Sequence, residues 1–260
     1  MQIFSKALLC SVGVVANAQG ATQTTTTYDL SADWSDAHNP SGPWSYNGGN
    51  KAIAVHQSAW ISACYVGSQP AWAAKPIGKG HIPAWYKMRV PVRSSCYGAP
   101  APTDLKIGDV AMHETDGFNG LGTDLANVTW TSPCAGNADV VGAVWLTRDI
   151  GRSMDWRVTF GPKLMASGKL WSGDPWNRAN PVRFAFKTPV SPGGVLKLEF
   201  KRTSTFGDIA GVRLTVKVDQ ICGHYGTYGK GCGPLLGFTG LPLIGKTFSV
   251  DLSRAKPKAP

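Results

Sequence analysis

Short segments in which apolar and polar residues alternate are the feature that most constrains the fold of this chain. They recur between residues 109 and 252, and the clearest are 126–131, 155–160, 182–187, 195–200 and 211–218. Alternation with a period of two places one face of a strand in a core and the other in solvent. No long stretch carries the period of an α-helix, which excludes an architecture of alternating strands and helices. We therefore predict an all-β fold, an antiparallel β-sandwich.

The N-terminal residues have the composition of an export signal. Lys6 precedes an apolar run at 7–15, and Ala16-Asn17-Ala18 forms a small-residue cleavage motif. The apolar run is far shorter than the ~20 residues that a membrane-spanning helix needs, and no other stretch approaches that length. We predict a secreted, extracellular protein without a membrane span.

The rest of the chain is divided by composition. One sandwich domain is expected over 28–255. The other predicted segments are a signal peptide at 1–18, a Thr-rich leader at 19–27, an irregular excursion at 48–106, a Gly-rich loop insertion at 219–246 and a basic tail at 256–260. The excursion is rich in Pro and Gly and shows no sustained period, so we expect long loops there.

Cysteine usage fits an oxidising compartment. Five of the six cysteines remain once Cys10 leaves with the signal. Cys222 and Cys232 are close in sequence, so we predict that they form a disulfide, and Cys64 with Cys96 is the next most economical pair. The sequence does not say what Cys134 pairs with. No C-x₂-C spacing occurs, which argues against a zinc site.

The chain is basic, with a formal net charge of +10 that falls to +9 when Lys6 is removed with the signal. The basic residues occur singly rather than in runs. For an exported protein an anionic extracellular surface is a better match for this charge than nucleic acid. Simple solubility is the alternative explanation.

Several segments of the chain carry a family resemblance. Residues 28–46 read YDLSADWSDAHNPSGPWSY, and the later segments are 110–113, 128–133, 156–171 and 184–215. Together they resemble secreted bacterial β-sandwich proteins of the carbohydrate-binding-module type, which open with a DLxADxS…NPxGxWSY pattern. The resemblance implies a jelly-roll fold and a polysaccharide or cell-wall glycan as partner. It transfers no catalytic residue, and it implies no cofactor other than the structural calcium that is common in jelly rolls.

A turn near the middle of the chain combines aromatic and polar side chains. Its candidate ligand-binding residues are Trp171, Asp174, Trp176, Asn177 and Arg178. Proteins bind sugars by stacking an aromatic face on the C–H groups and by bonding the hydroxyls with planar polar side chains. Alternatively, Trp171 is the last core residue of a strand and the rest is a simple turn. We expect both rings to stack on sugar, and Trp176 is the safer residue to test because Trp171 could belong to the core.

A second group of candidates follows a predicted strand that ends at His113. Glu114 and Asp116 would share a face if the strand continued, and paired carboxylates serve general acid–base catalysis or bind calcium. The alternative is a solvated turn. The spacing of an EF-hand is absent, so we predict no metal ligands from the sequence itself.

Other motifs add little. No Gly-x-Ser-x-Gly elbow and no phosphate-binding loop occurs. Asn127-Val-Thr129 is an N-glycosylation sequon, and in a eukaryotic host we expect Asn127 on the surface.

These features lead to one main hypothesis and two alternatives. The main one is a secreted, monomeric, non-catalytic β-sandwich that binds a polysaccharide or cell-wall glycan. The first alternative is a glycan-active hydrolase or lyase that uses Glu114 and Asp116. The second is a secreted, effector-like domain that binds protein through its stapled loops.

Overall fold

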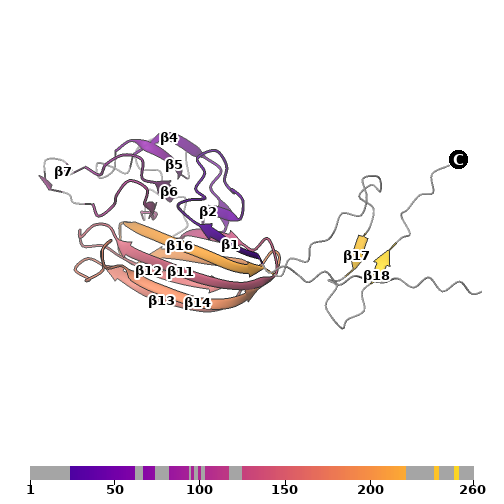
Figure 1. Ribbon diagram of the computed structural model, residues 1–260. Coiled ribbons are helices and arrows are strands. Elements are labelled where there is room, and N and C mark those ends of the chain that lie inside the picture. The colour runs from indigo at the N-terminus through magenta and orange to yellow at the C-terminus, as the bar shows by residue number, and fades with distance from the viewer. Residues whose placement is uncertain are drawn as a thin grey trace, which may run out of the picture. The chain divides into compact units, whose positions relative to one another are not determined.

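Two antiparallel β-sheets form the first unit of the chain, Met1–Cys222, and the second unit is Gly223–Pro260 (Figure 1). The computed structural model describes residues 24–61, 67–73, 82–93, 95–96, 99–100, 103–116, 125–220, 237–239 and 249–251. No helix that could cross a membrane occurs in these ranges. Several predicted features lie outside the described residues. These are the signal peptide, the tail, Cys64, Cys222, Cys232 and the side chain of Cys96.

The first sheet has six strands in the order β13-β12-β15-β10-β2-β3. Their bounds are β2 Trp44–Gly48, β3 Lys51–Ala52, β10 Leu125–Thr131, β12 Ser153–Phe160, β13 Lys163–Trp171 and β15 Val195–Arg202. All neighbours are antiparallel. This sheet is built largely from the segments in which alternation is clearest.

The second sheet has eight strands in the order β14-β11-β16-β9-β6-β5-β4, with β1 also paired to β16. Their bounds are β1 Thr24–Asp29, β4 His56–Trp60, β5 Gln69–Ala73, β6 Ala84–Lys87, β9 Val110–His113, β11 Gly136–Leu146, β14 Val182–Val190 and β16 Ile209–Gln220. The short strands β7 Ser95–Cys96 and β8 Ala99–Pro100 pair separately, as do β17 Gly237–Thr239 and β18 Ser249–Asp251.

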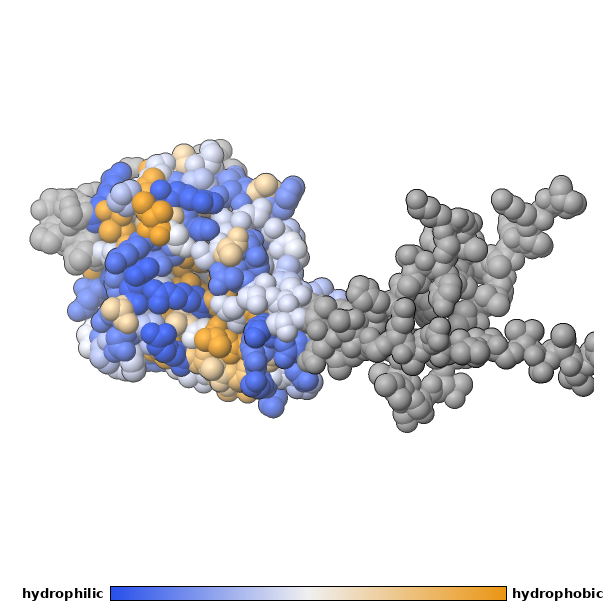
Figure 2. Space-filling view, viewed as in Figure 1, coloured by the Kyte–Doolittle hydropathy of each residue, from blue (hydrophilic) through white to orange (hydrophobic). Residues whose placement is uncertain are grey.

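Alternate side chains of both sheets meet in the main core. On β15 the inward side chains Leu196, Leu198 and Phe200 are buried, and on β16 the inward side chains from Val212 to Val218 are buried in the same cluster. The prediction of an all-β antiparallel sandwich is therefore confirmed. Hydrophilic residues cover most of the face seen in Figure 2, and apolar residues form small separate patches there.

The segment 48–106 contributes more regular structure than its sequence predicts. Strands β4, β5 and β6 extend the eight-stranded sheet and help to build a second buried cluster, which includes Trp60, Tyr86 and Trp145. Both Trp85 and Tyr86 on β6 are completely buried, each in a different cluster. In a strand that is covered on both faces, apolar and polar residues do not alternate. The sequence pattern therefore does not reveal such a strand.

The N-terminal boundary also differs from the prediction. Thr24–Thr27, expected in a leader, belong to β1, which pairs with β16 from Thr24 opposite Gln220 to Asp29 opposite Thr215. β-Branched threonines favour extended backbone, and the partner strand supplies the hydrogen bonds.

Candidate ligand-binding site

The predicted aromatic turn connects β13 to β14, and one carboxylate organises it. Asp174 accepts hydrogen bonds from the backbone N–H groups of Trp171 and Trp176, each at 2.9 Å. The Asp174 N–H donates to the Trp171 carbonyl at 3.1 Å. Asp favours turns because its side chain can satisfy nearby backbone donors in this way. The turn therefore holds the backbone at both tryptophans in one conformation.

The two tryptophans differ in exposure, and Trp171 is not the core residue that the alternative interpretation made it. The Trp171 side chain is 44% exposed, because Leu170 before it points into the core and successive strand residues face opposite sides. Trp176 is half-buried and packs against the main core. Trp171 is thus the more exposed of the two rings, and strand phase is the sequence signal that would have identified its exposure.

The other predicted ligand residues bond to the protein itself. Asn177 Oδ1 accepts from the backbone N–H groups of Ala179 and Asn180 at 3.0 and 2.9 Å. Arg178 donates to both carboxylate oxygens of the buried Asp109 at 2.6 and 3.0 Å, and this contact raises the pKa of Arg178. Asn177 and Arg178 thus shape the loop and anchor it to the sandwich.

A pocket of about 460 Å³ lies between this loop and the end of β11. Trp171, Asp174, Trp176 and Asn177 line it on the loop side, and Arg178 does not. On the opposite side the lining includes Asp104 and Asp149. The structure therefore brings four of the five predicted ligand residues to one pocket, which has an exposed indole and carboxylates around it.

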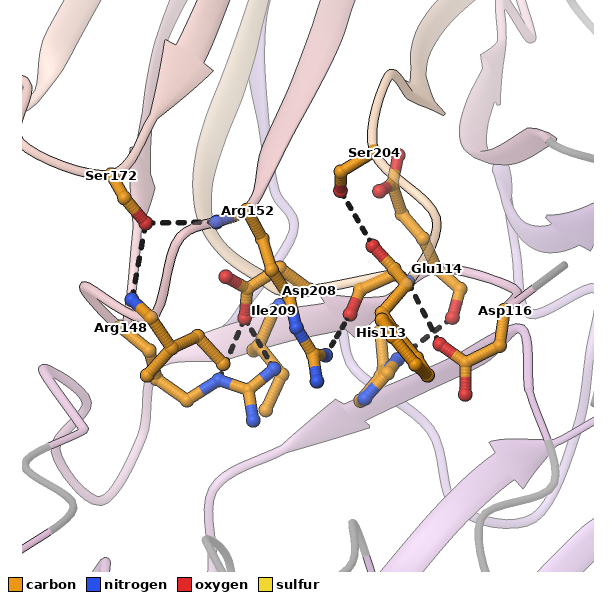
Figure 3. A network of polar contacts seen from close by, with 12 residues as sticks. His113, Glu114, Asp116, Arg148, Arg152, Ser172, Ser204, Asp208 and Ile209 are labelled. Carbon is orange, nitrogen blue, oxygen red and sulfur yellow. Dashed lines mark hydrogen bonds and ion pairs between the residues drawn. The ribbon is translucent and has the colours of Figure 1, made fainter.

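The predicted acidic pair lies in a different environment, a buried polar network (Figure 3). The Glu114 side chain is completely buried, and Asp116 Oδ1 accepts from the Gly207 N–H at 2.8 Å. The Glu114 backbone packs closely on Gly207, where a Cβ atom would come within 2.7 Å of the Glu114 carbonyl oxygen. The prediction of a solvated turn is wrong for Glu114, and a buried carboxylate does not reach a polymeric substrate.

Arg148 and Asp208 form an ion pair inside this network. Their side chains are 1% and 0% exposed, and Arg148 Nε donates to Asp208 Oδ1 at 2.6 Å. Burial raises the pKa of Asp208, and the nearby arginine charge opposes that shift. His113 is also buried, with Nδ1 2.7 Å from the Glu114 carbonyl oxygen, and burial lowers its pKa to about 3. No cluster of three metal-ligating side chains occurs in the described ranges.

The sequon residue Asn127 is not on the surface, which corrects the prediction from sequence. It is 1% exposed in the middle of the six-stranded sheet, and its Nδ2, the atom that a glycan would modify, donates to the Gly49 carbonyl at 2.5 Å. Asn127 lies opposite Asn47 and Glu199 on the neighbouring strands.

We expect the folded protein to carry no glycan at Asn127 when it is expressed in a eukaryotic secretory host. Attachment would break the bond to Gly49 and place a bulky sugar inside the sheet face. Intact mass before and after treatment with N-glycosidase F measures this. A glycan mapped to Asn127 in the folded, secreted fraction would contradict the expectation.

Sequence reasoning missed the outward face of the six-stranded sheet. Asn47, Asn127 and Glu199 are polar residues at outward positions, yet each is less than a tenth exposed. A groove of about 780 Å³ crosses this face over β12, β13 and β15. The alternation of apolar and polar residues predicts that these positions face solvent. The sequence of a single strand therefore does not predict that they are buried.

Comparison with known proteins yields no family. No family model and no curated protein matches the sequence. Among solved structures, the CBM22-1 xylan-binding domain from Paenibacillus barcinonensis covers 77% of this chain and 98% of its own, with 8% identity and a TM-score of 0.31. A family 35 carbohydrate binding module from Clostridium thermocellum covers 41% and 86%, with 15% identity and a TM-score of 0.24. At these TM-scores the similarities assign neither family nor ligand, and the fold follows from the strand pairing itself.

Proposed function

We propose that this chain is a secreted, non-catalytic β-sandwich that binds a polysaccharide or cell-wall glycan by stacking a sugar on Trp171. The observation that carries the proposal is the exposed Trp171 indole at the edge of a pocket of about 460 Å³. The export-type composition of residues 1–18 supports secretion.

The local structure favours binding because the backbone that carries the ring is held in place before a ligand arrives. Asp174 fixes the backbone of Trp171, and Arg178 ties the same loop to Asp109. An aromatic side chain has only two χ angles and therefore loses little conformational entropy on binding. Asp149 and Asp104 also line the pocket, and their carboxylate oxygens are acceptors for sugar hydroxyls, except Asp104 Oδ2, which already accepts from the Arg178 N–H at 2.5 Å.

Replacement of Trp171 by Ala should weaken retention by the bound glycan about tenfold, which corresponds to the loss of one stacking contact with its buried area. The fold should be unaffected because the ring is 44% exposed and Leu170, not Trp171, fills the core. Affinity electrophoresis against soluble xylan, mixed-linkage glucan and mannan measures retention, and chemical denaturation measures stability.

Val141→Ala is the matched control, since Val141 is 58% exposed on the eight-stranded sheet. Trp176→Ala should destabilise the protein, because Trp176 packs against the core. If Trp171→Ala and the parent protein migrate alike on every glycan that retards the parent, Trp171 is not the stacking surface.

A further inference from the structure

The outward face of the six-stranded sheet has a floor of buried polar groups. Arg157, Glu199, Asn127 and Asn47 are successive cross-strand neighbours on β12, β15, β10 and β2. Glu199, Asn127 and Asn47 are only 3%, 1% and 6% exposed. Outward-facing polar residues of a sheet are usually solvated, so burial here means that the surrounding side chains and backbone rise above them.

These floor groups hold one another in fixed positions. Asn47 Nδ2 donates to Asn127 Oδ1 at 2.9 Å. The Glu199 carboxylate accepts from Arg157 Nε at 2.7 Å and is paired with Lys197 Nζ at 3.2 Å. The Arg157 side chain is nevertheless 56% exposed, so a ligand can reach it.

The charge of this face is positive. Its outward charged residues are Arg157, Lys169, Lys197 and Lys201 against Asp155 and Glu199. Lys169 and Lys201 are the cross-strand neighbours of Asp155 on either side, and both are exposed. Neither ammonium group takes part in an ion pair within the described part of the chain. Two cations are thus available to a ligand.

Two hollows lie on this face, and Glu199, which lines one, is the cross-strand neighbour of Asn127, which lines the other. One of about 780 Å³ lies over β12, β13 and β15, and one of about 430 Å³ lies over β2 and β10. Pro162 and Leu164 form an apolar wall of the larger hollow. With neighbouring strands ~4.8 Å apart, the five strands β13 to β2 span ~19 Å, which is the scale of a short run of sugar residues.

We propose that this groove binds an acidic polysaccharide, with its carboxylate or sulfate groups held by Arg157 and Lys201, which line the larger hollow, and by Lys169 beside Asp155 on the same face. The site is separate from the Trp171 pocket and does not depend on it. Nucleic acid fits less well, because single strands are bound by stacking bases on exposed aromatic rings. Among the described residues that line the larger hollow, the aromatic one is Trp156, and it is 4% exposed.

The test compares polygalacturonate with its fully methyl-esterified form, which has the same backbone without the charge. Lys169→Gln/Lys201→Gln in the full chain should bind polygalacturonate about tenfold more weakly than the parent, as expected for two lost charge contacts. The matched control is Lys106→Gln/Lys217→Gln, which removes two exposed charges outside the groove. Titration calorimetry at low and at moderate salt gives the affinities, and screening by salt should weaken the parent's binding.

Several outcomes would overturn the proposal. They are an equal loss in the control variant, equal binding of the methyl-esterified polymer, no binding of polygalacturonate, and equally tight binding of a single-stranded DNA. Trp171→Ala separates the two sites, since it should leave polygalacturonate binding intact. If Lys169→Gln/Lys201→Gln still binds a neutral glycan and the parent does not bind polygalacturonate, only the groove proposal fails.

Discussion

Replacement of Asp208 by Ala should lower the free energy of unfolding by about 3–5 kcal/mol at neutral pH. Arg148 and Asp208 are both almost completely buried, so the variant leaves the Arg148 guanidinium in a low-dielectric region without this carboxylate. It also removes the acceptor of the Ile209 N–H, at 2.7 Å in the parent. Denaturant unfolding followed by tryptophan fluorescence measures the loss.

Two further variants separate charge from packing. Arg148→Met/Asp208→Leu removes both charges and keeps the volume, and it should recover most of the lost stability. Asp139→Asn breaks an exposed pair with Lys187, whose side chain is 82% exposed, and should change stability little. A single Asp208→Ala loss no larger than that of Asp139→Asn would refute the argument.

The sandwich could be predicted where a strand has one face in the core and the other in solvent. Leu196, Leu198 and Phe200 alternate with polar residues for this reason, and their burial followed directly from the sequence. Strand β6 could not be found in this way. Trp85 and Tyr86 are neighbours in sequence and both are buried, so apolar residues do not alternate with polar ones there.

The candidate site shows a different limit. Residues 171–178 could be identified as a unit from their composition, and the structure brings all of them except Arg178 to one pocket. Burial of Glu114 and Asn127 could not be foreseen, because it depends on neighbours far away in sequence. Glu114 packs on Gly207, and Asn127 bonds to Gly49, 78 residues earlier. The local sequence pattern predicts which residues of a strand face the core and which face outward. It does not predict which other segments cover the outward face.

The buried imidazole of His113 should make the protein sensitive to acid. Its pKa is lowered to about 3, first by burial and then by the charge of Arg148, with a smaller contribution from Arg152, although its bond to the Glu114 carbonyl opposes the shift. Between pH 6.5 and about 3 the unfolded chain therefore binds a proton that the folded protein does not. In that window this residue should make the free energy of unfolding fall by about 1.4 kcal/mol for each unit of decreasing pH.

The measurement that isolates His113 is the difference in slope between the parent protein and His113→Gln from pH 6.5 to 4.5. The pKa of Asp208 is raised in the folded protein, so the folded protein keeps the proton of this carboxyl group to a higher pH than the unfolded chain does. Asp208 therefore changes the free energy of unfolding with pH in the direction opposite to His113. That contribution is present in both proteins, and so the comparison removes it. His113→Gln should have a shallower loss of stability in acid even if it is less stable at neutral pH, whereas His38→Gln, at an exposed position, should follow the parent. Equal slopes for the parent and His113→Gln would show that His113 takes up its proton as readily in the folded protein as in the unfolded chain.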